Sequence, residues 1–98
     1  MTTKQRAILR GMASVYEPIL HIGKDGISEN TVKQCSDALE ARELIKVAVL
    51  NNSPYTAREA CGKLCEKTHA EPVQVIGNRF VIYRQARKNP KIILDELC

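Results

Sequence analysis

Residues 19–28 read ILHIGKDGIS, an apolar run that enters a Gly-x-x-Gly loop and then a typical helix start. Gly23 and Gly26 allow a sharp turn and leave the backbone N–H groups of the loop uncovered by side chains. Lys24 adds a positive charge between them. A helix that begins just after the loop supplies unpaired N–H donors and the positive end of its dipole. The stretch therefore has the components of a phosphate-binding loop, although most Gly-x-x-Gly loops are plain turns.

The helix after this loop has a well-marked beginning. Ser28 is a good N-cap, and Glu29 lies in the first turn, where the helix dipole favours a carboxylate. Ile27 and Val32 stand at the two positions of a hydrophobic staple. We expect the helix to cover about 29–41, with an inner face formed by Val32, Cys35 and Leu39.

Outward from this stretch, hydrophobic periodicity predicts seven elements in the order αβαβαββ. The predicted fold class is α/β, of the two-layer α+β type, with a four-stranded mixed sheet packed with three helices. Gly77-Asn78 is a hairpin signal, Thr3 is the expected cap of the first helix, and Gly11 within that helix suggests close packing. The expected helices are 3–14, 29–41 and 55–69, the last entered through Pro54, and the expected strands are 18–22, 43–50, 72–76 and 79–84.

The composition is that of a single domain spanning residues 1–98. Apolar residues make up 44% of the chain, and fifteen Lys and Arg against eleven Asp and Glu give a formal charge of +4. This balance favours an anionic partner, whereas the lack of Trp and the single Phe argue against a face of stacked aromatic rings. No apolar run approaches the roughly 18 residues that span a bilayer. Since the N-terminus also lacks a signal-peptide core, we expect a cytoplasmic protein with no membrane partner.

The four cysteines raise the question of a metal site. Cys61, Cys65 and His69 follow one another at four-residue intervals along a predicted helix. The same helix, however, carries a continuous apolar stripe that includes both cysteines, and a cysteine in such a stripe behaves as a small hydrophobic residue. We therefore expect no metal and no cofactor, and the roles of Cys35 and Cys98 stay open. The stripe consists of Ala57, Ala60, Cys61, Leu64 and Cys65.

Basic residues gather in three places outside the loop. Arg6 and Arg10 lie one turn apart on the first helix, on one face with Ser14. Lys46 interrupts an otherwise apolar strand, where a lysine is more often an edge or surface residue than a ligand contact. The third group is a C-terminal basic run, which continues into a basic tail from about residue 85. Any of these could be a solvated surface, and the run consists of Arg79, Arg84, Arg87, Lys88 and Lys91 with no acid between them.

These pieces, taken together, resemble the CRM domain, in its stand-alone bacterial form called YhbY. The resemblance covers nearly the whole chain in the right order, and its long central block is far more specific than the Gly-x-x-Gly loop alone. The matching segments are TKQR at 3–6, LRG at 9–11, PI at 18–19, IGKDGI at 22–27, ALEARELIKV at 38–47, VQVIG at 73–77, VIYR at 81–84 and KNPK at 88–91.

The resemblance implies an RNA-binding domain that acts on ribosomal RNA during assembly of the large ribosomal subunit. It also implies a fold similar to the C-terminal domain of bacterial translation initiation factor three. One departure is His69, where the family commonly has a glycine that ends the helix. The family's RNA-binding loop falls on Gly23, Lys24, Asp25 and Gly26, and its basic surface falls on Lys4, Arg6, Arg10, Lys24, Lys46 and Arg84.

Two other function classes are weighed against RNA binding. An enzyme could use the loop to hold a phosphorylated metabolite, but GKDG matches neither the P-loop nor the GxGxxG pattern. His21 and His69 have no recurring acid or nucleophile near them in sequence, so we assign no catalytic residue. A protein-binding adaptor could present the same basic patch to an acidic partner. In that case a Lys24→Glu change would leave RNA association intact.

Overall fold

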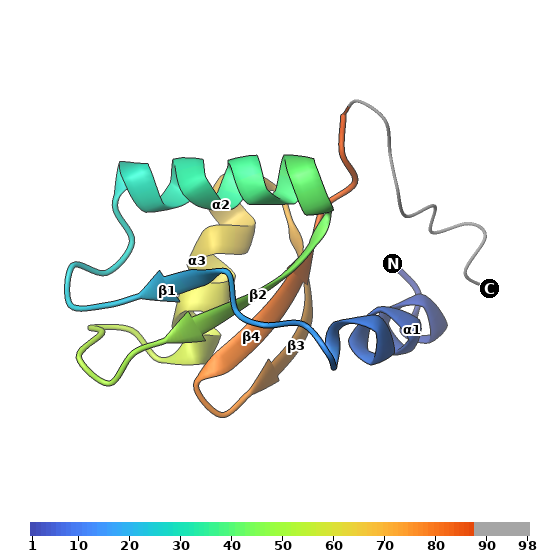
Figure 1. The fold of residues 1–98 in the computed structure, drawn as a ribbon, viewed down its shortest axis with the longest axis horizontal. Coiled ribbons are helices and arrows are strands. Elements are labelled where there is room, and N and C mark those ends of the chain that lie inside the picture. The colour runs from blue at the N-terminus through green and yellow to red at the C-terminus, as the bar shows by residue number, and fades with distance from the viewer. Residues whose placement is uncertain (88–98) are drawn as a thin grey trace.

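The computed structural model describes residues 1–87, which form the seven elements in the expected order (Figure 1). Each end of an element lies within two residues of its expected position. The predicted fold class is confirmed. The helices are α1 (Thr3–Ala13), α2 (Glu29–Arg42) and α3 (Ala57–Thr68), and the strands are β1 (Leu20–Ile22), β2 (Leu44–Val49), β3 (Glu71–Ile76) and β4 (Arg79–Tyr83).

The four strands form one mixed sheet in the order β1-β2-β4-β3. The β1 strand is parallel to β2, while β4 pairs antiparallel with both β2 and β3. The β3–β4 hairpin turns at the predicted position, and Gly77 supplies the positive φ of 58° that the turn requires. A register shift between Pro72 and Gln74 interrupts β3. Proline is tolerated there because β3 is an edge strand.

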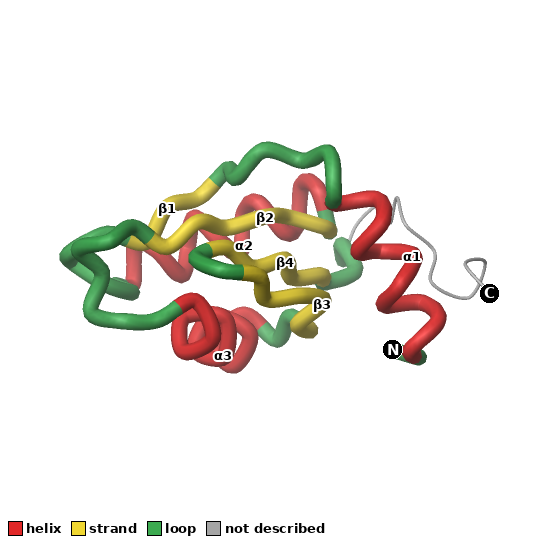
Figure 2. Tube along the Cα trace, turned by 90° about the horizontal axis from the view of Figure 1, so that it is seen from below, coloured by secondary structure: helices red, strands yellow, loops and turns green. Residues whose placement is uncertain are grey.

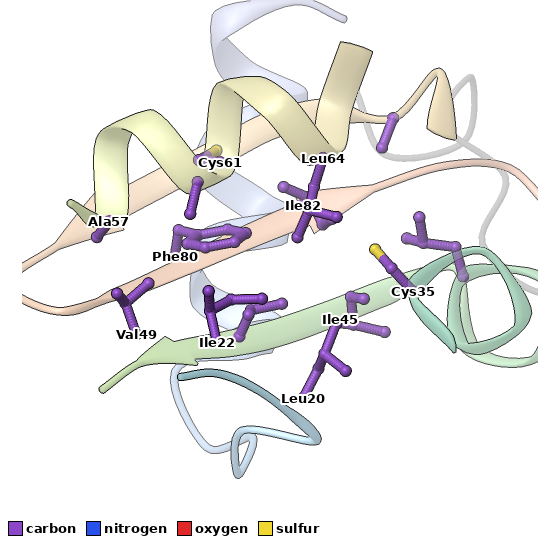
Figure 3. Close-up of a cluster of buried hydrophobic side chains, with 14 residues drawn as sticks. Leu20, Ile22, Cys35, Ile45, Val49, Ala57, Cys61, Leu64, Phe80 and Ile82 are labelled. Atoms are coloured by element: carbon purple, nitrogen blue, oxygen red, sulfur yellow. The ribbon is translucent and has the colours of Figure 1, made fainter. Parts of the chain in front are cut away.

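The main core lies between the sheet and the helices α2 and α3. Alternate residues of β2, namely Ile45, Val47 and Val49, face these helices together with Phe80 and Ile82 of β4. Figure 3 shows these side chains converging with those of the two helices. The predicted inner face of α2 and the predicted apolar stripe of α3 are therefore confirmed, including the burial of Cys61.

The helix α1 packs on the opposite face of the sheet, a placement that the sequence left open. A second, smaller core joins Leu9 and Ala13 of α1 to the strand residues Leu44, Val81 and Tyr83. The three strand residues alternate with those of the main core, so the two clusters lie on opposite faces of the sheet. Figures 1 and 2 show that α1 covers only one end of this second face.

The helices α1 and α3 differ from the sequence-based expectation in three details. Thr2, not Thr3, caps α1, because its hydroxyl accepts the Gln5 N–H while the Gln5 side chain accepts the Thr2 N–H, a reciprocal capping box. Thr56 caps α3 in the same way. This helix therefore begins at Ala57, two residues later than expected. Gly11 is exposed, with no atom within 4 Å of an added Cβ, so the expected close packing there is wrong.

The passage from α2 into β2 takes a single residue, Glu43. Its φ of 68° turns the chain at once from helix to strand, a conformation that non-glycine residues rarely adopt. The residue is fully buried, its carbonyl oxygen accepts the Arg84 N–H, and its carboxylate accepts the Ala86 N–H, both at 2.9 Å. Contacts to the last part of the described chain thus hold this strained residue in place.

Candidate nucleic-acid interface

The Gly-x-x-Gly loop is a hydrogen-bonded turn that follows β1. The Gly26 N–H donates to the Gly23 carbonyl oxygen at 3.0 Å, and Lys24 and Asp25 stand exposed at the two corners. The turn itself therefore uses the Gly26 N–H, one of the loop N–H groups that the sequence analysis considered as donors to a phosphate. The exposed Lys24 side chain is the cationic group of this loop that is suited to an anion.

The two glycines of the loop have different requirements. Gly26 has a φ of +67°, and a Cβ placed on it would lie 3.0 Å from Tyr55 Cε2 and 3.2 Å from Pro54 Cγ. Gly23 does not have a positive φ, and the nearest atom to an added Cβ lies at an ordinary 3.7 Å. Only Gly26 therefore needs to be glycine, both for its backbone conformation and for its packing against the segment before α3.

The beginning of α2 behaves as predicted. The Ser28 hydroxyl accepts the Thr31 N–H at 3.2 Å, and Ile27 and Val32 both pack against the main core. Glu29 lies exposed in the first turn, where its charge offsets the positive end of the helix dipole. Lys24 is the cation of this segment, and the exposed acids Asp25 and Glu29 lie near it in the sequence.

The α1 cations project from the helix in different ways. Lys4 and Arg10 are exposed, whereas Arg6 is half-buried and its Nε donates to the Pro72 carbonyl oxygen at 3.2 Å. This bond holds Arg6 against the edge strand β3. The terminal nitrogens of the Arg6 guanidinium take no part in the bond. Arg6 and Arg10 lie one turn apart, beside the face that packs on Leu44, whereas Lys4 is two residues from Arg6 and lies on another side of the helix.

Lys46 lies in the interior of the sheet, because β2 is flanked by β1 and β4. Of the two structural alternatives expected for Lys46, an edge or a surface residue, the edge one is therefore wrong, and its partly exposed side chain fits the surface one. Its half-buried side chain belongs to the sheet face opposite α2 and α3, in the part that α1 does not cover. We call this part the open face, and its residues on the four strands are His21, Lys46, Ala48, Gln74, Ile76 and Arg79.

Arg84 is directed into the protein instead of toward solvent. Its Nη1 donates to the Thr68 carbonyl oxygen at 2.9 Å and to Ser36 Oγ at 3.1 Å, and its Nη2 donates to the Ser36 carbonyl oxygen at 2.9 Å. Nη2 also lies 3.8 Å from Glu40 Oε1, and only 15% of the side chain is exposed. The geometry gives Arg84 a structural role that the family resemblance alone did not indicate.

The C-terminal basic run does not form one continuous edge. Arg79 is exposed on the open face, whereas Arg84 lies beyond the other end of β4 and contacts the helices. The Arg87 N–H donates to a Glu40 carboxylate oxygen at 2.9 Å, and Lys88 and Lys91 lie outside the described residues.

The structure brings some of the expected site residues together and separates others. Figures 1 and 2 place α1 and the Gly-x-x-Gly loop at opposite ends of the longest axis, with the open face between them. Lys46 lies between the two outer groups and links them. Sequence reasoning missed Tyr16 and Arg42, which line a hollow beside Lys46. The only sequence signal for this hollow was a tyrosine in a short connector.

Across residues 1–87 no three His, Cys, Asp or Glu side chains are arranged to hold a metal ion. In the same part of the chain no helix has the length and apolar character needed to cross a membrane.

Comparison with known proteins places the chain among relatives. The family model described as "CRS1 / YhbY (CRM) domain" matches residues 1–84. The chain belongs to the CRM domain family. This confirms the resemblance drawn from the sequence, and the matched range includes every element of the structure.

Individual relatives of this CRM domain agree with the family assignment. "Probable RNA-binding protein YqeI" of Bacillus subtilis is 40% identical over 94 residues, which are 96% of this chain and 98% of that protein. An "RNA-binding protein" of Haemophilus influenzae is 32% identical over 90% of this chain and 89% of its own length. The solution structure of the Staphylococcus aureus protein SAV1595, described as a candidate for RNA binding, has a TM-score of 0.78. It is 48% identical, and the match covers 95% of this chain and 97% of that one.

Proposed function

We propose that this CRM domain binds RNA through one continuous basic side of the molecule. That side consists of the exposed face of α1, the open face of the sheet and the Gly-x-x-Gly loop. Its phosphate contacts come from Lys4, Arg6, Arg10, Lys24, Lys46 and Arg79, whereas Arg84 holds the fold together.

The observation that carries this proposal is a set of cations without acidic partners. Among residues 1–87, the ion pairs within 4 Å join Met1 to Glu71, Lys33 to Asp37 and Arg84 to Glu40. None of the proposed contact residues takes part in them. Cations that are not paired within the protein can neutralise the phosphates of a nucleic acid and release the counterions bound to them. This release of counterions is the main source of affinity for nucleic acid. The relatives named as RNA-binding proteins support RNA as the partner.

The RNA that we propose is ribosomal RNA in precursors of the large ribosomal subunit, in the cytoplasm. This finer statement rests on the family resemblance. The contacts expected from these lysines and arginines go to the sugar-phosphate backbone, so they favour the shape of a structured RNA over a particular sequence. No step in this function requires a cofactor or a catalytic residue.

The first test measures the affinity for a labelled hairpin RNA by fluorescence anisotropy at several salt concentrations. If about five phosphates are neutralised, log K should fall with log salt at a slope of roughly −4. A Lys24→Glu, Arg10→Glu double variant should bind more weakly, with a slope shallower by about 2, because two contacts are lost. A slope near zero for the wild type would contradict the proposal.

The matched control is a Lys33→Glu, Lys67→Glu double variant. Both lysines are exposed, and they lie on α2 and α3, on the other side of the sheet. The net charge changes by the same amount, so a loss of affinity confined to the first double variant assigns the RNA to the basic side. If Lys24→Glu alone left RNA affinity intact, an acidic protein partner would become the better explanation of the loop.

A second test addresses the ribosome. Tagged protein in a cell lysate should sediment with large-subunit precursor particles at low salt. High salt and the Lys24→Glu, Arg10→Glu changes should both abolish this co-migration. If the protein stayed at the top of the gradient in every condition while still binding hairpin RNA, RNA binding would stand and the ribosomal target would be wrong.

A further inference from the structure

A hollow of about 390 Å³ lies beside Lys46, beneath the connector between α1 and β1. Figure 2 shows this connector arching from the end of α1 to the start of β1. The volume falls within the range of about 300–1,000 Å³ that is typical of small-ligand sites. Its walls come from the connector, the end of α2 and the start of β2, and the residues used below are Tyr16, Glu17, Ile19, Arg42 and Lys46.

The connector is fixed at both of its ends by backbone hydrogen bonds. The Tyr16 N–H donates to the Ala13 carbonyl oxygen and the Ile19 N–H donates to the Lys46 carbonyl oxygen, each at 3.0 Å. The side chains of Tyr16 and Ile19 nevertheless remain 37% and 40% exposed. The hollow is therefore bounded by an anchored segment that presents an aromatic ring and an aliphatic side chain to solvent.

Three charged side chains line the hollow. Arg42 and Lys46 contribute two cations and Glu17 contributes one carboxylate. Within the described part of the chain, none of the three takes part in an ion pair. An occupant that matches these charges brings an anionic group for the two cations and a hydrogen-bond donor for the carboxylate. To pack on Tyr16 and Ile19 it also brings a flat apolar surface.

We propose that this hollow holds one unpaired nucleotide of the bound RNA. Its base stacks on Tyr16 beside Ile19, and its phosphate lies against Lys46 and Arg42. Exposed bases commonly bind proteins by stacking on aromatic rings. The proposal rests on the proposed function, and Lys46 is the residue that the hollow shares with the basic side.

Glu17 gives the hollow a base preference. A carboxylate only accepts hydrogen bonds, so it favours a base edge that carries donors. Guanine presents two adjacent N–H donors on its Watson–Crick edge, and cytosine and adenine each present an amino group. Uracil presents a single N–H between two carbonyl oxygens, which the carboxylate repels. We therefore expect guanine to bind best and uracil worst.

The test compares a fully paired hairpin RNA with the same hairpin carrying one bulged nucleotide. The bulge is guanosine, uridine or an abasic site, and affinity is measured by fluorescence anisotropy. The guanosine bulge should strengthen binding about 5- to 150-fold over the paired hairpin, the range expected for stacking one base on an aromatic ring. The abasic bulge should give no such gain, because it supplies the bend without the base.

Protein variants then locate the effect. Tyr16→Ala should remove the gain from the guanosine bulge, whereas Tyr16→Phe should keep it, since the hydroxyl is not needed for stacking. Val15→Ala is the matched control, because Val15 is the neighbouring residue, is 83% exposed and does not line the hollow. Glu17→Gln should reduce the preference for guanosine over uridine. Because the chain has no Trp, Tyr16→Trp adds a single fluorophore that a stacked base should quench.

The outcomes separate this inference from the proposed function. If the wild type binds the paired hairpin with the expected salt slope but gains nothing from a guanosine bulge, the hollow is not a nucleotide site and the basic side still binds RNA. Equal gains from guanosine and abasic bulges would likewise overturn the inference. If no hairpin binds at all, both proposals are wrong.

Discussion

Gly26 shows how a single residue without a side chain can determine the shape of a loop. Its positive φ lets the chain turn from β1 toward α2, and its missing side chain makes room for Tyr55 and Pro54. The loop is therefore held against the segment before α3, and Lys24 is displayed at a fixed corner. In the RNA-binding function proposed above, a fixed backbone at Lys24 would reduce the entropy lost when a phosphate binds.

The two glycines of the loop should respond differently to alanine. Gly26→Ala forces a left-handed backbone conformation, which costs about 1–2 kcal/mol, and brings a Cβ within 3.0 Å of the Tyr55 ring. We expect it to lower the free energy of unfolding by about 2 kcal/mol or more in urea denaturation. Gly23→Ala is the matched control and should change stability by less than about 0.5 kcal/mol. Equal effects of the two substitutions would contradict this account of the turn.

Sequence reasoning identified this loop but could not rank its glycines. The Gly-x-x-Gly pattern is symmetric, and the difference between the two positions arises from contacts with residues almost thirty positions later in the chain. The same limit applies to Arg79 and Arg84. Their charges are visible in the sequence, but only the strand register and the helix ends show that one faces solvent and the other is enclosed.

At the scale of elements, Arg84 joins the chain after β4 to the two helices of the main core. Its guanidinium donates to Ser36 on α2 and to the Thr68 carbonyl oxygen at the end of α3. The carbonyl acceptors are those of Ser36 and Thr68, which lie on these two helices. The planar guanidinium of arginine can bind several such acceptors at once. The residue thereby fixes the relative positions of three elements.

Replacing Arg84 with lysine should separate the structural role from an RNA role. Lysine keeps the charge but cannot reach the same acceptors, so we expect the free energy of unfolding to fall by about 1–3 kcal/mol. RNA affinity under conditions where the variant is folded should stay within about twofold. Arg79→Lys, on the open face, is the comparison and should leave stability unchanged. A large loss of RNA affinity in folded Arg84→Lys would return this residue to the binding surface.

The elements themselves were predictable because local signals agree with one another. The Ser28 cap, the Gly77 hairpin and the alternation of Ile45, Val47 and Val49 each indicate the structure that forms. The position of α1 was not predictable, since its apolar stripe fits either face of a sheet. Which face of the sheet α1 covers depends on Leu44, Val81 and Tyr83, and these residues form an apolar patch only after the strands have paired.

For the whole molecule, stability should depend on pH through buried groups that ionise at high pH. Burial raises the pKa of Cys35 to about 11 from the usual 9.0, although nearby Arg84 lowers it slightly. Burial also raises the pKa of Tyr83, with Glu43 and Glu71 acting in the same direction. Both groups lose their proton more readily in the unfolded chain. The unfolded state therefore binds fewer protons above pH 9, and the free energy of unfolding must fall as pH rises.

We expect the free energy of unfolding to fall between about pH 9 and pH 11, with Cys35 contributing up to about 1.4 kcal/mol per pH unit. Urea denaturation under reducing conditions at several pH values measures this slope. Cys35→Ala should be less stable at pH 7, because a core position loses volume, but its stability should decline less steeply above pH 9. The same slope in both proteins would show that Cys35 does not ionise differently in the two states.

The strand order has a consequence for how the protein is made. The β4 strand lies between β2 and β3, yet of the four strands among residues 1–87 it is the last to be synthesised. A nascent chain that ends at Ile76 has no strand to join the two halves of the sheet, and α1 has only part of the surface on which it packs. The pairing of distant segments must therefore wait until translation of this region is almost finished. The surface that we propose for RNA, which combines α1 with the sheet, would then be completed only after β4 has been synthesised.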